Sequence, residues 1–397
     1  MDSNSSENRP PRIFFLGAGF SAPAGLPVAQ KLLGLVLSEL DLVGTGVHLR
    51  DALKQYRQYA KAMGRPPDAG VDIEDFGAYL DYEHTFGMLG SDTWSKEGNR
   101  AQLELRWGIG RVLHRHTPGI DSLPRCYVRF AESLRPRDLI VTFNYDTLLE
   151  MALEKVGMPH RRFPTRYSEI GLYSSTTDYE AEGKEVLILK VHGSLDWVSM
   201  KSYREENERY VRDGRPDALT ANIERDMLFG AKSVSPTHRL LEGPAPDDDP
   251  LADVYVIEDL QSYYTRRTVL YYHPPLILAP SVMKQAYGES LRGFWSGLPI
   301  FGWTWGGLSI IGYSLPAADP YARQVMYRLV RGYMKGLKDP RYRLGGATAR
   351  PMQIVDLRRK GKQERALRKA YGFMKPKYTE YHLGGFDEDA VRRLFSR

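Results

Sequence analysis

Three polar side chains of this sequence have the chemistry that enzymes use to move protons and to hold sugar hydroxyls. An imidazole has an ordinary pKa of about 6.5, so His192 suits the role of a general base at neutral pH. The Asn144 amide can donate and accept hydrogen bonds, and the Asp146 carboxylate can orient that amide or stabilise a developing positive charge. Taken alone, His192 is explained as a hydrogen-bonded turn residue and Asn144 as an Asx-turn, so the elements that position them decide between the interpretations.

Four apolar runs of strand character stop where a glycine or a polar residue appears. The runs begin at Ile13, Leu139, Val186 and Leu308. They end in Gly17, Ala18, Gly19, Phe20 and Ser21; in Asn144, Tyr145 and Asp146; in His192, Gly193 and Ser194; and in Gly312, Tyr313 and Ser314. Ligands of an open parallel sheet bind outside the carboxyl ends of its strands. A single parallel sheet would therefore bring all four groups to one edge.

The first of these runs has the pattern of a dinucleotide-binding unit. Residues 13–16 predict a buried strand, Gly17 and Gly19 predict a tight turn, and residues 28–40 have the spacing of an amphipathic helix. In such a unit the glycines let the backbone approach a pyrophosphate, which N–H groups at the turn and helix start can hold. Ala22 stands where the third glycine of the full pattern would be. A tight strand-to-helix connection without a ligand explains this stretch equally well on its own.

Taken together, the four groups resemble the sirtuin superfamily, in which Gly-Ala-Gly-x-Ser, Thr-Gln-Asn-x-Asp, His-Gly and Gly-x-Ser surround NAD in this order. Phe143 replaces the glutamine of the second motif. The forms that these motifs take in this sequence look most like those of the sirtuin-like NAD hydrolases of bacterial anti-phage defence. The resemblance touches the sheet core over roughly residues 12–360. It implies that NAD contacts Gly17, Ala18, Gly19, Phe20, Ser21, Asn144, Gly312, Tyr313 and Ser314, and the position of Asp356 adds a tenth candidate contact.

The expected fold is α/β, a Rossmann-like (sirtuin/DHS-like) parallel sheet flanked by helices. After a disordered lead at residues 1–11, a single NAD-binding domain is expected over 12–397. It would carry a helical insertion at about 28–135 and a mixed insertion, partly a mobile loop, at about 199–272. Strands are also predicted at 276–281, 352–356 and 378–383, followed by a closing helix at 387–394.

Asp356 stands at the end of the predicted strand 352–356. There a carboxylate can bind an adenosine ribose hydroxyl, or it can simply end the strand.

Composition excludes several other classes of protein. With 42% hydrophobic and 26% charged residues, the chain of 397 residues is of the globular type. Its single cysteine, Cys126, forbids an intrachain disulfide and the four-cysteine zinc module of deacylating sirtuins, so no zinc is expected. The net charge of +6 suits an acidic ligand and leaves direct nucleic-acid binding open. No apolar run resembles a signal peptide or a membrane span, so a cytoplasmic protein is expected.

Departures from the deacylating sirtuins narrow the expected reaction. Those enzymes usually have Gly-x-Pro-Asp-Phe-Arg after the first turn, whereas here Val28 and Ala29 follow Gly25-Leu26-Pro27. Without that motif and the zinc module, water is the expected acceptor, giving NAD hydrolysis to nicotinamide and ADP-ribose. His192 would be the base, Asn144 would orient water or ribose, and Asp146 would support them. ADP-ribosyl transfer, protein deacylation by a divergent sirtuin, and NAD or ADP-ribose sensing without turnover stay open as alternatives.

The resemblance also implies how such an activity would be controlled. An NAD-depleting effector of anti-phage defence, acting by abortive infection, would have to be silent until triggered. No separate sensor domain is recognisable in the sequence. A homo-oligomer is therefore expected, with a HerA-type hexameric ATPase as a candidate partner. The contacts are expected on the helical insertion and on the basic C-terminal third, and no membrane is expected to take part.

Overall fold

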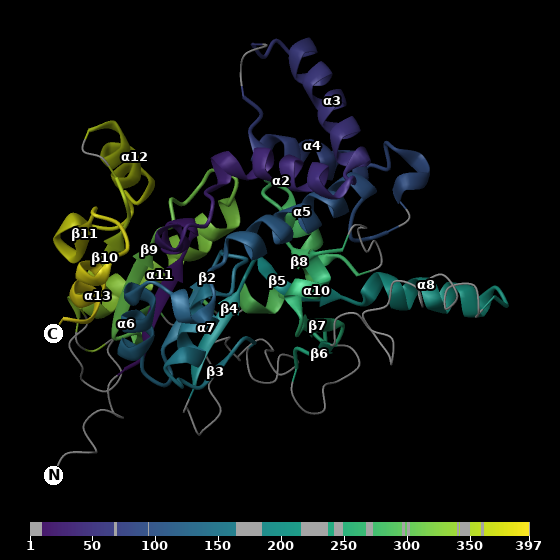
Figure 1. Cartoon of the computed structure of the whole chain (residues 1–397). Coiled ribbons are helices and arrows are strands. Elements are labelled where there is room, and N and C mark those ends of the chain that lie inside the picture. Colours follow the sequence, from purple (N-terminus) through teal and green to yellow (C-terminus); the bar gives the residue numbers. More distant parts are fainter. Residues whose placement is uncertain are drawn as a thin grey trace. The chain divides into compact units, whose positions relative to one another are not determined.

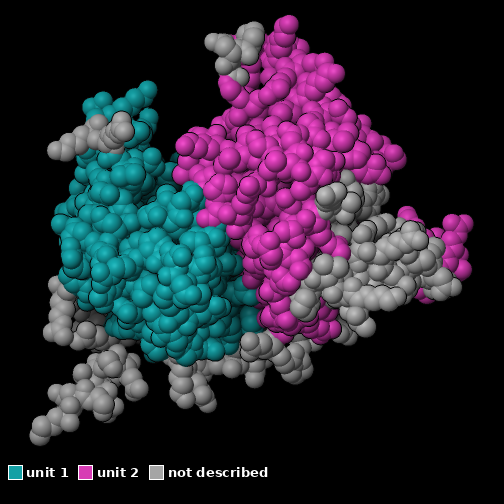
Figure 2. All heavy atoms as spheres, viewed as in Figure 1, with its two compact units in different colours: residues 1–26, 117–191, 291–397 teal, residues 27–116, 192–290 magenta. Residues whose placement is uncertain are grey.

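The computed structural model of the chain describes residues 10–66, 70–93, 95–163, 185–215, 237–241, 249–266, 273–295, 298–299, 302–339, 341, 350–358 and 361–396. The chain divides into two compact units, each built from separate stretches of sequence (Figure 2). Unit 1 comprises Met1–Leu26, Thr117–Val191 and Leu291–Arg397, and unit 2 comprises Pro27–His116 and His192–Ser290. The chain therefore passes between the units four times.

Unit 1 contains a seven-stranded sheet in which every pair of neighbouring strands is parallel (Figure 1). Its strands are β1 (Arg12–Leu16), β2 (Leu139–Thr142), β3 (His160–Arg161), β4 (Val186–Lys190), β9 (Gly307–Ile311), β10 (Met352–Val355) and β11 (Thr379–His382), in the order β11-β10-β9-β1-β2-β4-β3. The central strands are buried along their whole length, as expected where helices cover a parallel sheet. The predicted Rossmann-like sheet is confirmed.

Helices flank this sheet. They are α1 (Ala18–Ser21), α6 (Arg125–Ser133), α7 (Leu148–Lys155), α11 (Pro320–Lys338), α12 (Lys362–Ala370) and α13 (Glu388–Phe395). One face is covered by α6 and α13, because Phe14 of β1 packs against Phe130 and Phe395. The closing helix α13 was predicted from its sequence, and the Asp387 side chain caps it by accepting a hydrogen bond from the Ala390 amide.

The order of the strands creates a switch point beside β1. From β1 the chain continues to β2 and β4 on one side, and it later returns to place β9, β10 and β11 on the other side. In open sheets of this kind the crevice outside the carboxyl ends at the switch point is where ligands bind. The loops that follow β1 and β9 meet at this point.

Unit 2 combines helices with a small antiparallel sheet (Figure 1). The helices are α2 (Ala29–Val43), α3 (Val47–Ala62), α4 (Ile73–Thr85), α5 (Arg100–His116), α8 (Lys201–Arg212) and α10 (Leu260–Tyr264). The strands are β5 (Gly193–Ser199), β6 (Thr237–Arg239), β7 (Val254–Ile257) and β8 (Pro275–Ile277), in the order β6-β7-β5-β8. The largely buried helix α5 contacts α2, α3 and α4 as well as β5 and β8, so it joins the helices to the sheet.

The prediction for residues 276–281 was wrong. It placed a strand there at the edge of the parallel sheet, whereas β8 pairs antiparallel with β5 in the second sheet, with Gly193 opposite Ile277. A short apolar run predicts a buried strand but does not specify its partner. The predicted strands at 352–356 and 378–383 are confirmed as β10 and β11.

Several other features complete the described chain. Short 3-10 helices lie at Ala22–Ala24, Gly90–Thr93, Ile120–Ser122, Lys284–Tyr287, Glu289–Trp295, Gly302–Thr304 and Pro376–Tyr378. Residues 1–9 of the predicted lead and large parts of the predicted insertion at 199–272 lie outside the described residues. None of the described helices combines the length and the apolarity needed to cross a bilayer.

Candidate active site

The loops after β1 and β9 are held together backbone to backbone. The Gly17 amide donates to the Ile311 carbonyl and the Gly19 amide to the Gly312 carbonyl, each over 2.9 Å. A Cβ atom added at Gly19 would lie 2.6 Å from the Gly312 Cα, and one added at Gly17 would lie 2.6 Å from the Tyr313 Cα. Gly312 itself has φ +64°, in the left-handed region that glycine adopts without strain. The glycines thus allow two loops of the sheet edge to touch.

This contact corrects the reason expected for Gly19. The sequence suggested that a side chain there would stand where the backbone meets a pyrophosphate. In the structure the nearest atoms to such a side chain belong to Gly312. Gly19 is therefore required by the packing of the protein itself, whether or not a ligand is bound.

Ala18 and Phe20 of the first motif differ in how far their side chains are exposed. Ala18 is exposed, while the Phe20 ring is buried against Tyr127, Phe130 and Phe386. The Tyr127 hydroxyl also donates to the Phe20 carbonyl over 2.6 Å. Phe20 can therefore contribute only its backbone to a ligand, since its side chain belongs to the core.

A chain of hydrogen bonds joins the loop after β2 to the loop after β1. The Asn144 Nδ2 group donates to the Gly17 carbonyl and to the Ser21 Oγ, each over 2.9 Å. The Ser21 Oγ in turn donates to the Asp146 Oδ2 over 2.7 Å. Because the Gly17 carbonyl can only accept, these bonds fix which end of the amide is nitrogen. No donor among the described residues reaches the Asn144 Oδ1, which stays available to a ligand hydroxyl or a water.

Asp146 is a buried acidic residue next to the buried ion pair of Lys190 and Glu150. Burial raises the pKa of Asp146, and the Lys190 ammonium opposes that rise. Lys190 ends β4 and donates to the Asp146 carbonyl over 2.5 Å and to the Glu150 carboxylate of α7 over 2.8 Å. Neither Lys190 nor Glu150 was among the predicted site residues. The available signal was a lysine that closes an otherwise apolar, buried strand.

An aromatic stack crosses the carboxyl end of β1. The rings of Phe143 and Tyr313 are 3.8 Å apart and nearly parallel, at 4°. Phe143 follows β2 and Tyr313 follows β9, and β1 lies between these strands. The Tyr313 hydroxyl donates to the Asp319 Oδ2 over 2.6 Å, and Tyr371 donates to the Tyr313 carbonyl over 2.5 Å. Tyr313 is thus held in place at its ring, its hydroxyl and its carbonyl.

The two remaining predicted contacts on this edge differ in exposure. Ser314 is exposed, next to Tyr313. Asp356 follows β10, the strand beside β9, and is buried. Burial raises the pKa of Asp356, and Arg358, which donates to its Oδ2 over 3.1 Å, opposes the rise. The predicted hydrogen bond from a ribose hydroxyl to Asp356 stays a prediction.

His192 is the first residue of unit 2. The amide of the preceding residue, Val191, donates to the Thr142 carbonyl over 3.1 Å, so the chain leaves unit 1 directly after β4. The buried His192 accepts a bond at its own carbonyl from the Leu278 amide over 2.9 Å. Gly193, with φ +82°, then starts β5. The role of His192 as a base stays a prediction.

Within unit 1 the structure therefore brings together three of the four motifs. The loops beginning at Gly17, Asn144 and Gly312 meet at the ends of three adjacent strands, β9, β1 and β2.

The comparisons with known proteins bear on this edge. No curated protein matches the sequence. The chain is similar to a solved structure from work on the structural basis for the mechanism and regulation of Sir2 enzymes, at 13% identity over 92% of each chain and with a TM-score of 0.31. Residues 138–230 match the model of the SIR2-like domain family. The segment that contains Asn144, Asp146 and His192 is thus similar to a SIR2-like domain.

Proposed function

We propose that this protein is an NAD hydrolase that cleaves the bond between nicotinamide and ribose and gives ADP-ribose. The observation that carries the proposal is the hydrogen-bonded chain of Gly17, Asn144, Ser21 and Asp146 at the switch point of the parallel sheet. Support also comes from the similarity of residues 138–230 to the SIR2-like domain.

In the proposed complex, NAD binds across the loops after β1 and β9. Ala18 and Ser314 are exposed in these loops, and the rings of Phe143 and Tyr313 stack on each other beside them. The short α1 has too few residues to act as an anion-binding helix, so backbone amides and Ser314 would contact the phosphates. Asp356 would accept a hydrogen bond from the adenosine ribose.

Cleavage of this bond depends on how the ribose and the attacking water are oriented, and the leaving nicotinamide does not need to be protonated. The C1′–N bond of the ribose breaks, and nicotinamide leaves as a neutral molecule with the bonding electron pair. The resulting oxocarbenium-like sugar is attacked by water, whose oxygen forms the new bond to C1′ while its proton passes to a base. The Asn144 Oδ1 would hold a ribose hydroxyl or that water. His192, two residues beyond the end of β4, is the proposed base.

Asp146 acts through other residues in this proposal. Its Oδ2 accepts from Ser21, and Ser21 accepts from the Asn144 amide, so the carboxylate fixes Ser21 and through it Asn144. It is a positioning residue, since Ser21 stands between it and the amide.

The decisive test is the release of free nicotinamide from NAD by the purified chain, measured with the fate of the ADP-ribose part. Hydrolysis predicts equal amounts of nicotinamide and free ADP-ribose. His192→Ala and Asn144→Ala should each lower turnover by about 100-fold or more, the contribution expected of a general base or of a group that orients the attacking water. Label retained on a macromolecule would instead indicate transfer, and NAD binding without release would indicate sensing. A variant that keeps its fold and full turnover would remove that residue from the mechanism.

We also propose that the activity is controlled by self-assembly, as fits an NAD-depleting effector of anti-phage defence. Support comes from exposed large apolar side chains in the segment from α2 to the end of α4 and just beyond. They are Leu42, Val47, Tyr59, Met63, Tyr82, Phe86, Met88 and Leu89. Contact with another chain would remove such apolar side chains from water, which is favourable. A HerA-type ATPase is the proposed heterologous partner.

A further inference from the structure

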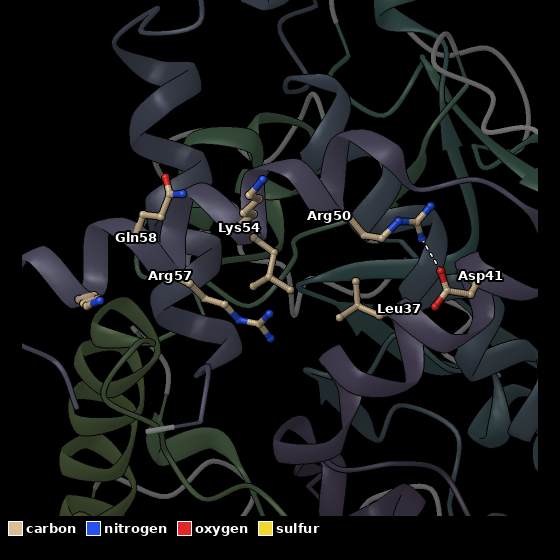
Figure 3. A pocket seen from close by; sticks show the side chains of 8 residues that line it. Leu37, Asp41, Arg50, Lys54, Arg57 and Gln58 are labelled. Atoms are coloured by element: carbon tan, nitrogen blue, oxygen red, sulfur yellow. Dashed lines mark hydrogen bonds and ion pairs between the residues drawn. The ribbon is translucent and has the colours of Figure 1, made fainter. Parts of the chain in front are cut away.

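Helices α2 and α3 of unit 2 enclose an open groove that the proposed NAD chemistry does not use (Figure 3). Its volume is about 510 Å³. Leu37 of α2 and Leu53 of α3 supply its aliphatic lining. The remaining lining comes mainly from cationic side chains of α3, namely Arg50, Lys54, Arg57 and Lys61. The groove therefore combines an apolar floor with a positively charged wall.

The four cations lie on one face of α3, because they are separated by four, three and four residues. Arg50 is already neutralised, since it donates to the Asp41 carboxylate over 2.6 Å and to the Thr45 carbonyl over 2.6 Å. Lys54, Arg57 and Lys61 have no ion pair with any residue that the structure describes. Figure 3 shows Arg50 turned to Asp41, with Lys54 and Arg57 further along the helix. Three positive charges thus face the groove without a counter-charge.

The spacing of these charges suits a regular polyanion. At about 1.5 Å per residue, Lys54 and Lys61 lie about 10 Å apart along the helix axis. One strand of a DNA duplex presents a phosphate about every 3.4 Å of its axis, so about three phosphates face that length. Between the phosphates the strand carries aliphatic sugar carbons, which match Leu37 and Leu53. The groove is complementary to a backbone that alternates apolar sugar with negative phosphate.

Two other acidic ligands fit less well. A single strand is usually held by aromatic side chains on which its bases stack, and none of the described residues that line this groove is aromatic. A peptide helix that binds in a groove relies on several apolar anchors, whereas the described lining of this groove offers two leucines. Charge must therefore supply most of the affinity, which is the regime of sequence-independent duplex binding.

We propose that the α2–α3 groove binds the sugar–phosphate backbone of double-stranded nucleic acid through Lys54, Arg57 and Lys61, without reading its sequence. The proposal does not depend on NAD cleavage.

The chain offers a closely matched control for the test. Lys362, Arg365 and Lys369 of α12 repeat the residue types and the spacing of Lys54, Arg57 and Lys61, on an exposed helix without the leucine floor. Each set is changed to glutamine in the full chain. Circular dichroism and thermal melting then confirm that both variants fold like the wild type.

Binding of a fluorescent DNA duplex of about 24 base pairs is followed by anisotropy from about 50 to 300 mM salt. The groove variant should weaken binding at low salt at least tenfold. It should also reduce the slope of log affinity against log salt by about 2.7, the value for three lost phosphate contacts. The α12 variant should leave both quantities near those of the wild type. An equal loss in both variants, or an unchanged slope in the groove variant, would overturn the proposal.

Competition identifies the class of ligand. An unlabelled duplex, of DNA or of RNA, should displace the probe better than a single strand or polyglutamate of the same total charge. Stronger competition by the single strand would overturn duplex recognition, and stronger competition by polyglutamate would assign the groove to an acidic protein instead.

Discussion

The absence of a Cβ atom at Gly19 allows its loop to pack against Gly312 at the edge of the sheet. Gly19→Ala should destabilise the protein by about 1–3 kcal/mol, because the new Cβ would lie 2.6 Å from the backbone of Gly312 and one loop must move. Gly34→Ala is the control, since no atom lies within 4 Å of that added Cβ and alanine favours the helix. Urea unfolding measures both. A Gly19→Ala variant of normal stability that has lost only NAD binding would support the pyrophosphate role instead.

Asp146 makes stability depend on pH in a defined direction. Its folded-state pKa is raised by burial above the ordinary value of about 3.9, so the folded state keeps the proton longer than the unfolded chain does. Its contribution to stability is complete below about pH 3.9 and is lost as the pH rises through the folded-state pKa. Asp146→Asn has no such titration. Its free energy of unfolding, measured in urea from acid to neutral pH, should therefore rise relative to the wild type. A constant difference would contradict the raised pKa.

The sequence predicted which residues lie at this edge of the sheet, but it did not predict which residues they bond to. Asn144 and Asp146 were singled out by their place after a buried strand, and the loops they belong to do meet the loop at Gly17. The bond between Lys190 and Glu150 joins residues of two elements. No local pattern encodes such a pair, because its meaning comes only from the strand and helix being packed together.

At the scale of elements, the Lys190–Glu150 pair ties β4 to α7. Lys190→Met should cost about 3–5 kcal/mol, because it leaves the Glu150 carboxylate buried without its cation. The double variant Lys190→Met, Glu150→Leu removes both charges and should regain most of that loss. Chemical unfolding of the two variants and the wild type tests this. If the double variant is as unstable as the single one, the carbonyl of Asp146 rather than Glu150 is the important partner.

The sequence predicted helices and strands correctly where the pattern of apolar residues extends over the whole element. The buried strands β1, β2, β9 and β10 are continuous apolar runs, and α2 has regular apolar spacing. Strand β3 was missed because two residues form no pattern. The apolar run through His192 was also ambiguous, since β4 and β5 follow one another closely yet belong to different sheets. Local sequence cannot specify a change of sheet when both strands are apolar.

For the whole molecule, the exposed apolar side chains of unit 2 predict an oligomer. Met63 and Phe86 are each 67% exposed, at the ends of α3 and α4. The double variant Met63→Glu, Phe86→Glu should shift the protein to smaller species in sedimentation velocity, because a buried charge at an interface is costly. Ile120→Glu, at a less exposed apolar position of unit 1, is the control and should leave the distribution unchanged. A wild type that sediments as a monomer at micromolar concentration would contradict the prediction.

The pairing of β1 with β9 also determines when the parallel sheet can form during synthesis of the chain. Leu16 lies opposite Ile311, so β1 cannot complete its pairing until β9, far along the chain, has been made. Until the ribosome has released that part, the loop at Gly19 has no Gly312 to rest on. A growing chain therefore carries an open sheet edge and an unfinished crevice. A chain that ended before β9 would lack the Gly312 loop on which Gly19 packs, and with it one side of the proposed NAD site.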